Sequence, residues 1–165
     1  MLIIIVTIIY TINISMKLIN PSPENFNKNY IYFNDPIQNT IINESRFIRI
    51  IYSTPNIIFN GINVLISFVI DSVEKQYNKN IINYCIEKNE NAISVINNIE
   101  KTILDKYCSN KTPSYNLALQ VTSGSLKLFS ESIDKKKNID IILKISGLWE
   151  DDSSYGITYK FLVTD

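Results

Sequence analysis

Hydrophobic and polar positions alternate with a period of two in several segments of this chain. Residues 155–163 show the pattern most clearly, because Ile157, Tyr159 and Phe161 fall on one face and Thr158 and Lys160 fall on the other. Such alternation is typical of strands with one buried face. Further strands are predicted over residues 30–33, 46–52, 81–86, 126–129 and 139–148. Residues 71–80 are expected to form a polar connection, and residues 150–154 an acidic turn.

The dipeptide Asn60-Gly61 separates two apolar segments, residues 57–59 and 62–70. Asn and Gly tolerate the positive φ values of a type I′ turn, and the twist of this turn matches that of paired strands. The sequence therefore predicts a β-hairpin centred on Asn60 and Gly61.

Between residues 90 and 107 the hydrophobic period changes from two to 3.6. Polar residues, Glu100 among them, are expected on the side opposite the apolar stripe. This pattern predicts one amphipathic helix that ends around residues 108–110, ahead of Pro113. The apolar stripe consists of Ala92, Val95, Ile96, Ile99, Ile103 and Tyr107.

The predicted order places a single helix between two groups of strands, which is typical of an α+β domain. We therefore expect a β-dominated α+β fold, either an antiparallel sheet or a partly open OB-like barrel, with one amphipathic helix at about residues 90–107. Residues 16–165 are expected to form a single β-rich domain.

Residues 1–15 form an apolar leader before this domain. The leader lacks a positively charged opening and a convincing cleavage site, and it is short for a membrane span of about 20 residues. Three interpretations remain open: an extension upstream of a start at Met16, a signal or membrane anchor, or an added β-strand. Secretion or membrane attachment is therefore the alternative to an intracellular location.

The composition excludes several classes of function. Ile makes up roughly a fifth of the chain, and Asn is also in excess, which indicates an AT-rich genome. The chain contains no His, which removes the commonest general acid–base, the commonest zinc ligand and the usual nucleophile triads. Neither an enzyme nor a metal or other cofactor is expected. Cys85 and Cys108 are expected to be free thiols that are buried or half-buried, with a single disulfide as the alternative.

The strongest candidate site combines aromatic and cationic side chains near the last two predicted strands. Single-strand nucleic-acid binders stack bases on aromatic rings and follow the phosphates with cations. The competing interpretation is that the rings fill the core, the lysines cap a solvated face, and the two arginines form ordinary ion pairs. The formal net charge of zero offers no overall basic field, so a local patch is required. The candidate residues are Arg46, Arg49, Lys127, Lys144, Trp149, Tyr155, Tyr159 and Lys160.

Residues 141–161 contain the segments Lys-Ile-Ser-Gly-Leu-Trp-Glu and Tyr-Gly-Ile-Thr-Tyr-Lys-Phe, separated by an acidic turn. This region resembles the carboxy-terminal signature of small proteins of nucleocytoplasmic large DNA viruses, and the similarity extends over residues 16–163. The resemblance implies DNA binding at a viral replication site in the host cytoplasm.

Two functions are therefore expected to compete. The first is a non-enzymatic, replication-associated module that binds single-stranded DNA. The second is a protein–protein interaction or structural module, as in a virion or a host-interacting component. Long apolar strands with few charges favour edge pairing, so a homo-oligomer is also expected.

Overall fold

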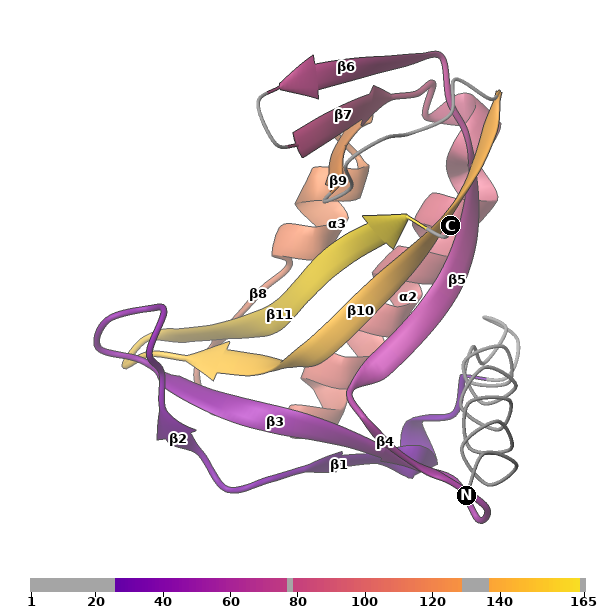
Figure 1. Cartoon of the computed structure of the whole chain (residues 1–165). Helices are drawn as coiled ribbons and strands as arrows, with labels where there is room; N and C mark the ends of the chain where they lie inside the picture. The colour runs from indigo at the N-terminus through magenta and orange to yellow at the C-terminus, as the bar shows by residue number, and fades with distance from the viewer. Residues whose placement is uncertain (1–25, 77–78, 129–136, 164–165) are drawn as a thin grey trace, which may run out of the picture.

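The computed structural model describes residues 26–76, 79–128 and 137–163, which form a β-dominated α+β fold (Figure 1). The leader expected over residues 1–15 lies outside the described residues. Within the described ranges, no helix is both long enough and apolar enough to cross a bilayer. The helices and strands, in chain order, are β1 (Ile31–Phe33), β2 (Ile37–Gln38), β3 (Arg46–Ser53), β4 (Ile58–Asn60), β5 (Ile62–Val69), β6 (Ser72–Gln76), β7 (Lys79–Asn83), α2 (Glu90–Tyr107), β8 (Thr112–Ser114), α3 (Asn116–Val121), β9 (Ser125–Leu128), β10 (Asn138–Glu150) and β11 (Ser154–Val163).

Strand β10 is the centre of an eight-stranded sheet. It pairs with β11 on one side, and on the other side first with β5 and then with β3. Strands β1, β2 and β4 pair with β3, and β8 runs parallel to β11. The sheet curls strongly around α2 like half of a barrel (Figure 1). The predicted fold class is confirmed: an α+β, β-dominated fold with a curled, largely antiparallel sheet and one amphipathic helix.

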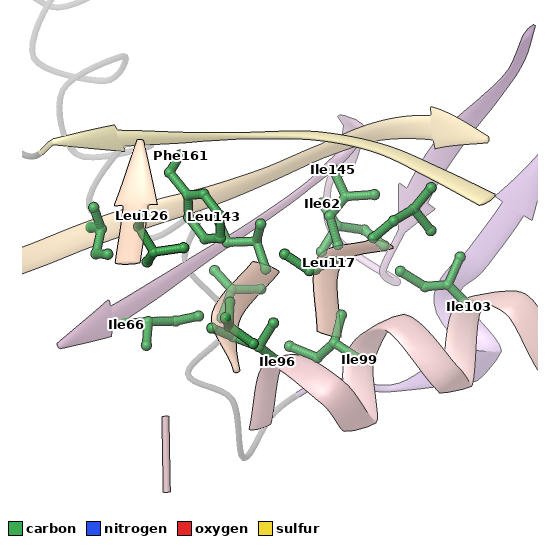
Figure 2. Packing of buried hydrophobic residues seen from close by; sticks show 14 of the residues in the cluster. Ile62, Ile66, Ile96, Ile99, Ile103, Leu117, Leu126, Leu143, Ile145 and Phe161 are labelled. Atoms are coloured by element: carbon green, nitrogen blue, oxygen red, sulfur yellow. The ribbon is translucent and has the colours of Figure 1, made fainter. Parts of the chain in front are cut away.

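The hydrophobic core lies between this sheet and α2. Leu143, Ile145 and Phe161 point from β10 and β11 toward the helix, and each is at most 2% exposed (Figure 2). Ile96 and Ile99 face them from α2 and are equally buried. Alternate residues of a strand point to opposite faces, so the residues between the buried ones lie on the other side of the sheet.

Helix α2 spans residues 90–107, as the 3.6-residue period predicts. It ends at Cys108, whose φ of 50° is left-handed and whose N–H donates to the Leu104 carbonyl. The prediction that Glu100 lies on the solvent side is wrong, because this side chain is 0% exposed. Its two carboxylate oxygens accept hydrogen bonds from the backbone N–H groups of Leu117 (3.0 Å) and Ala118 (2.7 Å). The short helix α3 covers this part of α2.

The predicted hairpin at Asn60-Gly61 is also wrong. Strand β4 pairs with β3 before this dipeptide, and β5 pairs with β10 after it, so the dipeptide is a corner between two partners. Gly61 has a φ of 93°, and a Cβ there would lie 2.6 Å from the Ile145 carbonyl oxygen. The corner therefore needs glycine for its conformation and for close approach to β10. The hairpin joins β3 to β4 instead, with the N–H of Thr54 donating to the carbonyl of Ile57.

The expected polar connection over residues 71–80 is wrong for most of its length. Residues Ser72–Gln76 form β6, which pairs with β7, and β7 pairs with β9 in a second, three-stranded sheet. Strand β6 is polar because it is an edge strand with mostly exposed side chains. Cys85 and Cys108 are free thiols, and Cys85 is half-buried as expected, but Cys108 is exposed, so the expectation that it is at least half-buried is wrong.

Candidate nucleic-acid interface

Four of the eight predicted site residues lie on one face of the large sheet. We call the side turned away from α2 the outer face. Cross-strand partners lie on the same face of a sheet. Lys144 pairs with Lys160, and Trp149 pairs with Phe47. Arg49 lies two residues after Phe47 on β3, so it is on the outer face as well. The outer face of β3, β10 and β11 includes Asp140, Ile142 and Leu162 toward one end, and Phe47, Arg49, Lys144, Gly147, Trp149, Gly156, Thr158 and Lys160 over the rest.

A β-bulge at Ser146 makes this arrangement possible. The register of β10 against β11 shifts between Ile145 and Gly147, so β10 contains one extra residue. Lys144 and Trp149 are five residues apart, and in a regular strand this odd spacing would put them on opposite faces. The extra residue brings both side chains to the outer face. Sequence reasoning missed the bulge, and the glycine after Ser146 is the only local hint of it.

The two aromatic rings of the outer face lie against glycines of neighbouring strands. A Cβ added to Gly156 would lie 2.9 Å from Cζ2 and Nε1 of Trp149, and one added to Gly147 would lie 2.7 Å from the ring of Phe47. Each ring therefore covers the backbone of a glycine and is half-buried.

Three cations accompany the rings. Lys144 and Lys160 are direct cross-strand partners, and within the described ranges no carboxylate lies within ion-pair distance of either ammonium group. The guanidinium carbon of Arg49 lies 5.7 Å from the centre of the Phe47 ring, and Nη1 donates to Oδ1 of Asn60 at 3.0 Å. Among the described residues, none of these three cations forms an ion pair, and Asp140, on the same face of β10, accepts a hydrogen bond from the hydroxyl of Ser67.

The other four predicted residues lie elsewhere. Tyr155 and Tyr159 are on the inner face: Tyr155 is 4% exposed, and the hydroxyl of Tyr159 donates to Oε1 of Gln120 at 2.7 Å. Burial raises the pKa of Tyr159 to about 12. Lys127 is exposed on β9, in the second sheet. For Tyr155 and Tyr159 the structure thus favours the competing interpretation, in which aromatic residues fill the core.

Arg46 forms an ion pair, as the competing interpretation expects, and it belongs to a network around Glu150 that sequence reasoning missed. Oε1 of Glu150 accepts from Arg46 Nη2 and from Lys111 Nζ, each at 2.8 Å, and Oε2 accepts from the hydroxyl of Tyr107 at 2.6 Å. Burial by itself would raise the pKa of Glu150, but these hydrogen bonds and charges outweigh it and lower the pKa below 4.5. The network joins β3, β10, the end of α2 and the segment before β8.

The acidic turn between β10 and β11 is organised by the side chain of Asp151. Oδ1 of Asp151 accepts from the backbone N–H groups of Ser153 and Ser154, each at 2.8 Å, which lowers the pKa of Asp151 to about 2. This agrees with the acidic turn predicted over residues 150–154.

The described part of the chain holds no group of three or more side chains arranged to bind a metal ion. Comparison with family models, with curated proteins and with solved structures found no match for this chain.

Proposed function

We propose that the protein is a non-enzymatic module that binds single-stranded nucleic acid on the outer face of its large sheet. One observation carries the proposal. Among the described residues, Lys144 and Lys160 lie opposite each other without an acidic partner, on the same face as the ring of Trp149. Like charges placed directly opposite destabilise a sheet. A phosphate group between the two lysines would remove this repulsion.

The arrangement supports a simple binding mode. Bases stack on Trp149 and Phe47, and such stacking contributes about 1–3 kcal/mol per base. Arg49, Lys144 and Lys160 neutralise phosphates, which releases counterions and makes the affinity depend on salt. Single-stranded DNA in viral replication is the setting that the resemblance to proteins of large DNA viruses implies.

The test uses the single tryptophan of the chain as a reporter inside the proposed site. We expect a single-stranded oligonucleotide to quench the fluorescence of Trp149, and fluorescence anisotropy of a labelled strand to give an affinity that falls steeply as salt rises. Trp149→Leu is expected to weaken binding by about 1–3 kcal/mol. Tyr115 is exposed and lies outside the large sheet, between β8 and α3, and it supplies the control variant Tyr115→Leu, which leaves the affinity unchanged. Absence of binding at low salt would end the proposal.

A second candidate function is a protein–protein interaction module, and it is favoured by one edge of β5, which pairs with no strand that the structure describes. The N–H of Val69 donates to Oδ1 of Asn89 at 2.8 Å, and its carbonyl accepts from Nδ2 of Asn89 at 2.9 Å. The backbone groups of Val69 therefore point away from β10. Since backbone direction alternates along a strand, Asn63, Leu65 and Ser67 present theirs on the same edge, and within the described residues no strand pairs there.

An open edge of this kind can accept an extended strand from another chain. This candidate predicts an assembly without nucleic acid, measured by size-exclusion chromatography with light scattering. Leu65→Lys should dissociate that assembly, because a charge on an edge strand opposes pairing. A wild-type monomer at all concentrations would count against the second candidate and leave the first one standing.

A further inference from the structure

The loop between β2 and β3 presents apolar side chains to solvent at one end of the outer face. Ile41 is 87% exposed and Ile42 is 42% exposed, and Ile37 on β2 is 57% exposed. Large apolar side chains gathered at one place on a surface often mark a site of interaction.

The loop is held in a defined shape by its own polar groups. Oδ1 of Asn39 accepts from the N–H groups of Ile41 (2.9 Å) and Ile42 (3.2 Å), as in an Asx turn. The hydroxyl of Ser45 donates to the Ile42 carbonyl at 2.8 Å, and the N–H of Asn39 donates to the Ser45 carbonyl at 3.0 Å. Glu44 has a left-handed φ of 55°. These bonds fix the positions of the two isoleucines before any partner binds.

The loop continues the aromatic row of the proposed binding face. Ile37 is the cross-strand partner of Phe47, and Phe47 is the partner of Trp149. These three side chains therefore form one row across β2, β3 and β10. Figure 1 shows the β2–β3 loop at the same end of the sheet as the turn between β10 and β11. A strand stacked on Trp149 and Phe47 would reach Ile37 and then the loop.

We propose that Ile41 and Ile42 form an apolar wedge that packs against the last base pair where a single strand joins a duplex. The preferred ligand is then a junction between single-stranded and double-stranded nucleic acid. Apolar side chains, isoleucine among them, are used by proteins to separate stacked bases. This inference rests on the proposed function, because the outer face must hold the single strand while the wedge contacts the duplex end.

The experiment compares three labelled probes by fluorescence anisotropy: a single strand, a blunt duplex, and a hairpin duplex with a single-stranded tail of the same length as the free strand. We expect the junction probe to bind about tenfold more tightly than the free strand. The double variant Ile41→Ser/Ile42→Ser should bind both probes with the wild-type affinity for the free strand. Ile58→Ser is the matched control, because Ile58 is 71% exposed but lies on β4, at the other end of β3.

The outcomes separate the two proposals. If the wild type binds no probe, the proposed function fails. If the wild type binds the free strand and the junction equally, the wedge is overturned while the proposed function stands. A loss of affinity for the free strand in the double variant, or an equal loss of junction preference in Ile58→Ser, would also overturn the wedge.

Discussion

Lys144 on β10 and Lys160 on β11 are direct cross-strand partners on the outer face of the sheet, and they lack an acidic partner among the described residues. Side chains in such positions are about 5 Å apart at Cβ. The pair therefore costs the folded protein some stability, although it suits an anionic ligand. Stability and binding should respond in opposite directions when the charge of Lys160 is changed.

The variant Lys160→Glu tests this opposition. We expect the free energy of unfolding to rise by about 0.5 kcal/mol, because repulsion is replaced by an opposite-charge pair. Affinity for a single strand should fall at least about tenfold, and the slope of log K against log salt should decrease by roughly 0.7 for each lost phosphate contact. Lys127→Glu changes the net charge equally on β9 and should leave the affinity close to that of the wild type. Equal effects of the two variants would contradict the assignment of the outer face.

Alanine substitutions at Gly147 and Gly156 should destabilise the protein to different extents, because the added Cβ meets backbone at Gly147 and a side chain at Gly156. A Cβ at Gly147 would lie 2.3 Å from the Ile48 carbonyl oxygen, so the backbone must move. We expect Gly147→Ala to destabilise the protein by about 3 kcal/mol, at the upper end of overpacking effects. At Gly156 the obstacle is the Trp149 side chain, which can shift, so a smaller loss of about 1–2 kcal/mol is expected.

Urea denaturation followed by circular dichroism measures both losses. Trp149 gives a second readout, because Gly156→Ala should displace its ring toward water and shift its emission to longer wavelength. Wild-type emission from Gly156→Ala would show that the indole does not lie against this glycine.

The sequence could predict the elements whose hydrophobic period is long and regular. Helix α2 repeats its apolar residues over five turns. In β11, Tyr159 and Lys160 alternate between the two faces, so the inner and outer faces of this strand follow from the hydrophobic pattern alone. Residue type alone places Tyr155 and Tyr159 with the cations in the candidate site, whereas alternation along β11 puts both on the inner face.

The remainder depends on contacts between distant parts of the chain. The bulge at Ser146 adds one residue to β10, and a period of two cannot show which residue is the extra one. Asn60-Gly61 has the composition of a hairpin turn, but Gly61 instead provides the close approach of the corner to Ile145. Glu100 is polar and lies on α2, and only the packing of the short helix α3 reveals that it is buried.

The Glu150 network predicts an acid-sensitive contribution to stability. In the folded state the pKa of Glu150 is below its usual value of 4.5, so the unfolded protein binds the proton more tightly. The contribution is therefore fully present above about pH 4.5 and is lost as the pH falls through the lowered folded-state pKa. Glu150→Gln should cost about 3 kcal/mol at neutral pH, because it leaves the mostly buried Lys111 without its carboxylate.

Urea denaturation between neutral and acidic pH measures this difference, which should shrink as the pH falls below about 4.5. Arg46→Gln is the comparison, because the Arg46 side chain is 55% exposed and its loss should cost under about 1 kcal/mol. A stability difference between wild type and Glu150→Gln that stays constant with pH would contradict the charged network.

Glu100 should show the opposite dependence on pH. Burial raises its pKa, and the hydrogen bonds from the N–H groups of Ala118 and Leu117 only partly oppose the rise. The folded protein therefore binds the proton more tightly, so stability is greatest below the usual pKa of 4.5 and declines as the pH rises through the raised value. In Glu100→Gln this decline should disappear. Glu90→Gln, an exposed change in the first turn of the same helix, should retain it.

Removal of the side chain in Glu100→Ala tests its hydrogen bonds rather than its charge. Two backbone N–H groups of α3 would lose their acceptors, which should cost about 2 kcal/mol or more. Hydrogen exchange of the Leu117 and Ala118 amides should then accelerate more than that of the α2 interior. Since the Tyr159 hydroxyl binds Gln120 of α3, loosening of α3 should extend to the inner face of β11. Unchanged protection of both amides would show that α3 is held by its apolar contacts alone, with the buried carboxylate contributing nothing to its position.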